Sequence, residues 1–258
     1  MSFPTLAILI LSVAFMVLAP SSQAQTSDAD NHLIFLPEGL LFPPLTADPQ
    51  EPRMGLRKEI GTSRMKLDIG GTLDLLELAS SPDDRFRLGV SFFTYALTTS
   101  NQGLRLQVDA VDGFFGGYLT YRKSLKGSAA SARLRILHVS AHFVDGHFDS
   151  VPWEDGIEAI PFTKDLGELL GAYIWTMGWT EAMVYAGVSY ATLVRPEEIR
   201  KVSSLSGLEL HTLGDAISVI GKPLIFFAAY NLSLTGVSTY IGTNTLEAGM
   251  KFGKWSGS

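Results

Sequence analysis

The stretch from Arg85 to Leu97 reads RFRLGVSFFTYAL and alternates large apolar residues with polar or small ones. Successive side chains of a β-strand point to opposite faces of its sheet, so this alternation predicts a strand with one apolar and one polar face. Comparable blocks recur between turns rich in Gly, Asp, Ser and Pro, which predicts an all-β fold with one short helical segment at residues 196–202. The blocks expected to form strands are residues 65–75, 85–97, 104–110, 114–121, 133–143, 171–179, 182–193, 205–213, 224–234, 238–243 and 246–252.

Period-two alternation fits two architectures. A soluble β-sandwich buries its apolar face against a second sheet, whereas an outer-membrane barrel turns that face to lipid and its polar face inward. Many blocks reach about ten residues, the length that crosses a bilayer at a tilt, and Tyr and Trp gather near block ends as aromatic girdles do. We therefore expect an antiparallel transmembrane β-barrel of about ten strands. A soluble periplasmic β-sandwich that binds a ligand is the alternative.

Residues 1–24 have the composition of a signal peptide. Leu6 to Leu18 is an uncharged apolar run that is too short for a comfortable membrane span. The small residues Ser22 and Ala24 follow it and predict cleavage after Ala24, and hence export to the bacterial outer membrane. An uncleaved N-terminal anchor is the alternative, because no Lys or Arg precedes the run. The chain contains no cysteine, which excludes disulfides and thiolate metal sites.

The chain after residue 24 divides into two parts. Residues 25–52 form an extended, Pro-rich leading segment, since five prolines between Pro37 and Pro52 preclude a long helix. Residues 53–258 are expected to form the barrel domain. Residues 1–24 carry no charged side chain, so the exported chain keeps the net charge of -6, which gives no support to nucleic-acid binding.

Two histidines flank a serine in the block RLRILHVSAHFVD, residues 133–145. His138, Ser140 and His142 would line one face of a strand, with Asp145 following. One interpretation is a polar network that fills a narrow barrel. Another is catalysis, in which His138 activates the Ser140 hydroxyl and an acidic residue orients the histidine; the candidate acids are Asp145, Asp149, Glu154 and Asp155. The His-x-Ser spacing is similar to that of outer-membrane lipid A deacylases.

The same block argues against a metal site and raises a question of register. His138 and His142 would lie about 13 Å apart in a regular strand, too far to share one ion, so no metal is expected there; the alternative is a bulge or turn near His142 that brings His142, Asp145 and His147 together. No cofactor is expected. Arg133 and Arg135 share parity with Leu137, so a regular strand puts the arginines on the apolar side. A β-bulge near residues 136–137 would shift the phase and resolve this.

We expect the arginines of the barrel to form interstrand ion pairs inside it, with a charged pore or an anion site as the alternative. These arginines are Arg85, Arg87, Arg105, Arg122, Arg133 and Arg135, and the expected partners are Asp68, Asp74, Asp109 and Asp112.

Several motifs give the chain a resemblance to the bacterial outer-membrane proteins grouped as the domain of unknown function DUF1207. They are FLPEGLLFPPL at residues 35–45 with ADP at 47–49 and PR at 52–53, HVSAHFVD at 138–145, VYAG at 184–187 and LEAGMKFG at 246–253. Ala141 and Gly146 depart from the pattern of that family, which has serine and an acidic residue there. The resemblance implies an outer-membrane β-barrel and no established activity. It also implies a further strand after Trp255, which leaves open a C-terminally truncated barrel.

These patterns predict an outer-membrane β-barrel that serves envelope structure, or binds or passes a small solute. The expected partners are outer-membrane lipid and lipopolysaccharide. The alternative with an enzymatic activity is a lipid A deacylase-like esterase that uses Ser140 and His138.

Overall fold

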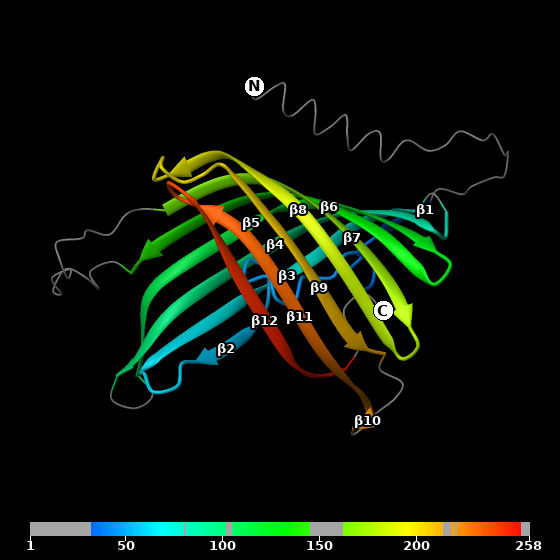
Figure 1. Cartoon of the computed structure of the whole chain (residues 1–258), viewed down its shortest axis with the longest axis horizontal. Coiled ribbons are helices and arrows are strands. Elements are labelled where there is room, and N and C mark those ends of the chain that lie inside the picture. Colours follow the sequence, from blue (N-terminus) through cyan, green and yellow to red (C-terminus); the bar gives the residue numbers. More distant parts are fainter. Residues whose placement is uncertain are drawn as a thin grey trace. The chain divides into compact units, whose positions relative to one another are not determined.

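The computed structural model describes residues 32–79, 81–101, 105–144, 162–213, 218–219 and 221–253, and these form an all-β antiparallel fold, as predicted (Figure 1). The long strands have 11 to 21 residues, enough to cross a bilayer at a tilt. The strands are β1 (His32–Phe35), β2 (Gly55–Lys58), β3 (Arg64–Ala79), β4 (Asp84–Asn101), β5 (Arg105–Leu125), β6 (Ser128–Phe143), β7 (Phe162–Met177), β8 (Thr180–Arg195), β9 (Val202–Thr212), β10 (Ser218–Val219), β11 (Lys222–Gly236) and β12 (Tyr240–Phe252).

The strands from β3 onward pair mainly with their neighbours along the chain, and the resulting sheet is strongly curved (Figure 1). Its order is β1-β3-β4-β5-β6-β7-β8-β9-β11, with β12 on β11, β2 on β3 and β10 on the start of β11. Within the described ranges, no hydrogen bonds join β12 to the β1–β3 edge, so the fold is barrel-like with a sheet that hydrogen bonds do not close. That part of the chain also contains no helix long and apolar enough to cross a membrane.

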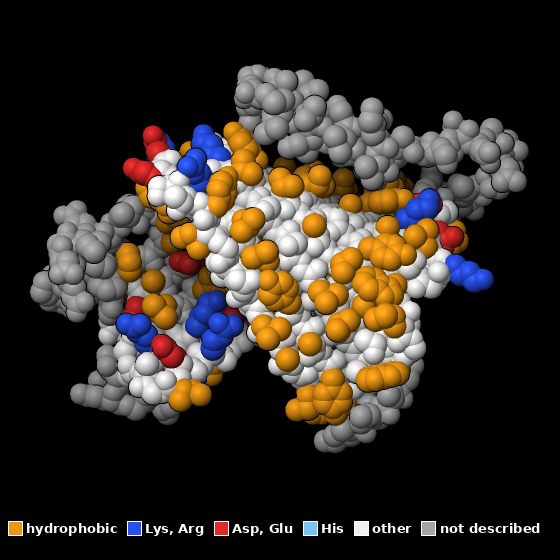
Figure 2. Space-filling model, viewed as in Figure 1, with side chains coloured by type: hydrophobic (Ala, Val, Ile, Leu, Met, Phe, Trp, Pro, Cys, Tyr) orange, Lys and Arg blue, Asp and Glu red, His pale blue; other side chains and the backbone are white. Residues whose placement is uncertain are grey.

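The two faces of the sheet have the opposite polarity to those of a water-soluble protein. On β4 the apolar residues Leu88 and Phe92 point outward and are 47% and 55% exposed, whereas Arg87 points inward and is 4% exposed. The outer face in Figure 2 carries hydrophobic side chains across its centre, and charged side chains gather at its margins. The alternation from Arg85 onward therefore predicted both faces of β4.

Three details of the predicted strands and turns were wrong. The blocks at residues 104–110 and 114–121 belong to one strand, β5, because residues 111–113 continue its pairing with β4 and β6. The blocks at 238–243 and 246–252 are likewise joined in β12 by continuous pairing with β11. The helical segment expected at 196–202 is a turn that leads into β9.

Residues 37–53, here called the strap, lie against the concave face of the sheet and belong to no strand. The strap follows β1, which lies in the leading segment and pairs with β3. Its backbone N–H at Leu41 donates to Asp74 of β3 at 2.9 Å, and its Thr46 N–H donates to Glu209 of β9 at 2.6 Å. Near its end, Arg53 forms a salt bridge of 3.1 Å with Glu247 of β12. The strap therefore connects strands from both sides of the sheet.

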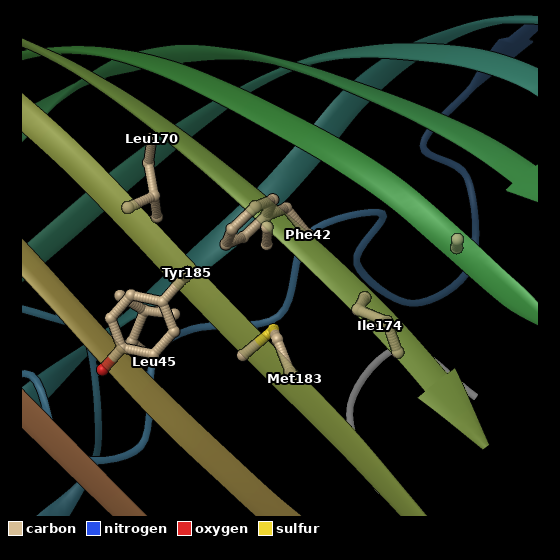
Figure 3. Close-up of a cluster of buried hydrophobic side chains, with 8 residues drawn as sticks. Phe42, Leu45, Leu170, Ile174, Met183 and Tyr185 are labelled. Atoms are coloured by element: carbon tan, nitrogen blue, oxygen red, sulfur yellow. The ribbon is translucent and has the colours of Figure 1, made fainter. Parts of the chain in front are cut away.

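An apolar cluster holds the middle of the strap. Phe42 and Leu45 pack among side chains of β7 and β8, which Figure 3 shows converging on the strap from the curved wall. Leu45 and Leu170 are almost fully buried, at 1% and 0% exposure. The cluster comprises Phe42, Leu45, Ala129, Leu170, Ala172, Ile174, Met183 and Tyr185. It lies toward the end of the sheet that carries the β5–β6 and β7–β8 turns.

Candidate functional site

The concave face contains a large cavity at the end of the sheet opposite the apolar cluster around Phe42 and Leu45, here called the strap cluster. This inner cavity has a volume of about 960 Å³. The β8–β9 and β11–β12 turns contribute to its rim through Ile199 and Val237, and the strap contributes Pro49 and Gln50. A second apolar cluster that includes Phe93, Phe114, Val139 and Leu166 forms the adjoining wall. The volume is within the usual range of small-molecule sites.

A buried belt of charges separates the inner cavity from the strap cluster. Glu51 of the strap accepts hydrogen bonds from Arg133 at 3.2 Å and from Arg135 at 3.0 Å. Arg135 also binds Glu168 of β7 in a bidentate manner, with both N···O distances 2.9 Å. Buried charges persist only when they are paired and hydrogen-bonded, so this arrangement fixes the strap and both strands relative to one another.

A second charged network fastens the start of the strap to β3 and β4. Arg87 pairs with Asp74 at 2.8 Å and with Glu77, and it donates to the Gly39 carbonyl oxygen at 3.0 Å. Tyr118 of β5 donates its hydroxyl to the same Asp74. Gly89 leaves room for this contact, because a Cβ there would lie 2.2 Å from the Tyr118 ring. The predicted interior ion pairs are therefore present for Arg87 and Asp74, and Arg85 pairs with Glu77 at 2.6 Å.

The strap and the belt leave little free space between them. The void lined by Phe42, Glu51, Tyr118 and Arg135 has a volume of about 10 Å³, roughly what one water molecule needs. Asp48 of the strap is also buried, and this burial, followed by the negative charge of Glu51, raises the pKa of its carboxyl to about 6. This part of the concave face is therefore packed, whereas the inner cavity is not.

Two lysines stand in the wall of the inner cavity, and their surroundings differ. Lys66 of β3 forms a salt bridge of 3.2 Å with Asp68 and lies 3.6 Å from the centroid of the Tyr95 ring. Among the described residues, Lys164 of β7 forms one hydrogen bond, to the Ser203 hydroxyl at 3.4 Å, and no carboxylate lies within salt-bridge distance of it. Asp112 of β5 completes the set of charged side chains in the wall.

The histidine motif lies on the outer face of the sheet. Along β6 the inward residues Arg135, Leu137 and Val139 are buried, and Ile136 on the opposite face is 69% exposed. His138 shares the face of Ile136: its ring lies 4.8 Å from the half-exposed ring of Phe115. The expectation that the histidines face the interior was therefore wrong.

The bulge predicted near residues 136–137 is also absent. β6 pairs with β5 and β7 in regular register throughout, so the arginines and the apolar residues do share one face. This is possible because Glu51 and Glu168 neutralise the arginines. A register shift does occur nearby, between Asp165 and Leu166 in the pairing of β7 with β8.

The structure gives His138 an acidic partner that the sequence did not suggest. Its Nδ1 lies 2.5 Å from Asp165 Oδ1, and the two residues are opposite each other in the β6–β7 register. Ser140 and His142 share parity with His138, but no hydrogen bond joins Ser140 to either histidine in the described chain. Asp145, together with the other acids proposed as partners, lies outside the described residues. Among the residues that are described, no group of three His, Asp or Glu side chains could hold a metal ion.

A groove of about 680 Å³ on the outer face begins at this His–Asp pair. It crosses Gly116 and Gly117 of β5, and Gly117 shares the outward face of Phe115 and Leu119, so the absence of its side chain lowers the surface there. Apolar side chains including Leu88, Phe115 and Ile136 form its sides. The pair therefore borders an apolar surface.

Sequence reasoning did not find the acids of the belt. Glu51 is 82 residues from Arg133 and Glu168 is 33 residues from Arg135, so no local spacing connects them. The only available signal was the pair of arginines on an apolar face, which requires acidic partners from elsewhere. No protein-family model, curated protein or solved structure matches this chain.

Proposed function

We propose that the protein is an outer-membrane β-barrel whose interior binds a small solute, and that it belongs to the DUF1207 group that it resembles. The observation that carries the proposal is the reversed polarity of the sheet: large apolar side chains cover the outside, and charged ones are buried inside. A soluble β-sandwich would need a second sheet to cover that apolar face, and the described strands form one continuous sheet. Lipid is the environment that satisfies such a surface.

Binding is favoured over passage because the strap fills one part of the concave face. A solute crossing the interior would have to disrupt the contacts of Glu51 with Arg133 and Arg135, which are buried and hydrogen-bonded. The free volume beside that belt is about 10 Å³, whereas the inner cavity measures about 960 Å³. A solute is therefore expected to occupy the cavity and to leave by the side from which it came.

Replacement of an outward isoleucine by lysine tests the membrane location. Ile136→Lys puts a charge on the outer face of β6 and should destabilise a lipid-embedded barrel by about 2–4 kcal/mol. Ile60→Lys is the matched control, because Ile60 lies in the β2–β3 turn at 98% exposure and its replacement should change stability by less than about 0.5 kcal/mol. The measurement is urea unfolding of the heat-modifiable folded band in membranes. A protein that fractionates as soluble without a folded-band shift, and that tolerates both changes equally, would contradict the proposal.

A lipid-modifying esterase is the second candidate, favoured by the His138–Asp165 contact beside an apolar groove. A carboxylate on Nδ1 orients a histidine to act as a base through its other nitrogen, and Ser140 lies two residues along the same face. The test is mass spectrometry of lipid A acyl chains after expression of the intact protein and of Ser140→Ala. Loss of an acyl chain that depends on Ser140 would support the esterase, and identical lipid A in both strains would remove it.

A further inference from the structure

We infer that the inner cavity binds a single-chain amphiphile whose anionic head group, a carboxylate or a phosphate, pairs with Lys164. The inference rests on the proposed function, because it assigns a ligand class to the cavity of that barrel. It is argued from the charge that the cavity leaves unbalanced, from the apolar character of its wall and from the position of its other charges.

Lys164 supplies the unbalanced charge. It faces inward on β7 between two buried valines of the adjoining strands, Val139 and Val194. A lysine held in apolar surroundings is unfavourable unless an anion pairs with it. Within the described ranges its one hydrogen bond goes to the neutral Ser203 hydroxyl, and Glu168 on the same face of β7 is already bound by Arg135, whereas the other lysine of the wall, Lys66, has Asp68. An anionic group of a ligand would complete the environment of Lys164.

The remaining wall is suited to a hydrocarbon chain. Phe114, Leu166 and Ile199 belong to or pack against one apolar cluster and also line the cavity. Tyr95 joins them through an edge-to-face contact with Phe114, with ring centroids 5.1 Å apart. Burial of a methylene group against such a surface contributes about 0.8 kcal/mol, so a long alkyl chain would supply most of the affinity.

The other charges limit the ligand to one anionic end. Asp112 stands on β5, two strands across and two residues along from Lys164, which puts about 12 Å between them on the wall. It would repel a second anionic group on that side. On the strap side, Pro49 and Gln50 contribute no charge. The arrangement therefore favours one acidic head and an uncharged tail.

Displacement of cis-parinaric acid from the full-length protein in detergent tests the inference, with the fluorescence in the same detergent alone as the blank. The competitors are palmitate, lysophosphatidic acid and hexadecanol, which share an alkyl chain and differ in the head group. Lys164→Met keeps the length of the side chain and removes the charge. The substitution should weaken the binding of palmitate or lysophosphatidic acid by about tenfold and leave the binding of hexadecanol unchanged. The acid that binds more tightly to the wild type identifies the head group.

Three variants serve as controls. Lys222→Met removes an exposed lysine at the start of β11 and should leave the binding of all three competitors unchanged. Ala110→Trp fills the inner cavity and should weaken the binding of all three competitors by at least about tenfold. Val139→Phe replaces it if the tryptophan variant does not fold. The heat-modified band shift establishes folding for each variant.

The outcomes separate this inference from the proposed function. A folded, membrane-embedded barrel whose parinarate fluorescence equals the detergent blank would overturn the inference and leave the proposed function intact. If the wild type and Lys164→Met bind palmitate equally well, and likewise hexadecanol, the assignment of an anionic head group would be overturned. Unchanged binding after the cavity is filled would show that the ligand lies elsewhere, and would also overturn it. A soluble protein without a band shift would instead defeat the proposed function.

Discussion

Two leucines on the same face of β7 illustrate how differently the two parts of the concave face are used. Leu170 belongs to the apolar cluster of Phe42 and is fully buried, whereas Leu166, four residues away and 5% exposed, lines the inner cavity. Between them lies Glu168, which pairs with Arg135. A single strand thus contributes to a packed interior, to a charged belt and to an open cavity. The difference indicates that the strap provides stability and that the cavity is available for a ligand.

The largest effect is expected when the belt loses its strap carboxylate. Glu51→Gln leaves Arg133 and Arg135 with Glu168 as the one carboxylate partner that the described residues give them in a buried setting, and breaking a buried ion pair costs about 3–5 kcal/mol. Urea unfolding of the folded band measures the change. Glu197→Gln is the control, because its pair with Arg195 is exposed and should contribute no more than about 1 kcal/mol. Similar small losses in both variants would show that the belt does not anchor the strap.

Truncation of the two leucines compares the two parts directly. Leu170→Ala should destabilise the protein by about 3–5 kcal/mol, because the strap and β8 pack around the side chain and cannot collapse into the space. Leu166→Ala should cost about 2 kcal/mol less, since one side of that leucine already faces the cavity. The same urea measurement applies to both. Equal losses would contradict the division into a packed part and an open part.

The strap should also give the stability a dependence on pH through Asp48. Its pKa in the folded state, about 6, is above the ordinary value of 3.8, so the folded state holds the proton more tightly. The stability that this group contributes is therefore fully present below pH 4. It decreases as the pH rises from about 4 to 6, by about 3 kcal/mol in total.

Asp48→Asn removes this titration and provides the measurement. We expect the variant and the wild type to have similar unfolding free energies at pH 4, and the variant to be the more stable at pH 7. The side-chain carbonyl of asparagine can still accept the hydrogen bond that the Gln50 N–H donates to Asp48 at 3.0 Å. A difference between the two proteins that does not vary with pH would contradict the prediction.

The smallest effect is expected at the end of the strap. Arg53 and Glu247 form a salt bridge of 3.1 Å between partly exposed side chains, and such pairs contribute about 0–1 kcal/mol. Glu247→Gln should therefore lower the unfolding free energy by less than about 1 kcal/mol in the urea assay. A loss as large as that of Glu51→Gln would mean that the contact with β12, rather than the belt, holds the strap.

The all-β fold could be predicted from the sequence because local alternation determines which face of a strand is apolar. On β4 the order of Arg87, Leu88 and Phe92 was sufficient to assign both faces. It was insufficient on β6, where Arg135 and Leu137 share one face and His138 the other. The assignment there depends on Glu51 and Glu168, which reach the arginines only after the strands have paired and the strap has entered.

The candidate site was less predictable than the fold for the same reason. The motif around His138 and Ser140 was visible in the sequence, but its partner Asp165 comes from the pairing of β6 with β7. The inner cavity arises from side chains of several strands, two turns and the strap, and Lys164 is distinguished by having no carboxylate of the described chain within salt-bridge distance. None of these relations has a fixed spacing along the chain.

Thiol labelling tests the division of the concave face most directly, because the chain has no natural cysteine. Ala110→Cys places a thiol in the wall of the inner cavity, and Ala129→Cys places one in the cluster against the strap. The rate of reaction with a charged, water-soluble methanethiosulfonate reagent is measured on the folded protein in membranes. We predict rapid modification at residue 110 and protection at residue 129. Equal rates at the two positions would contradict the account.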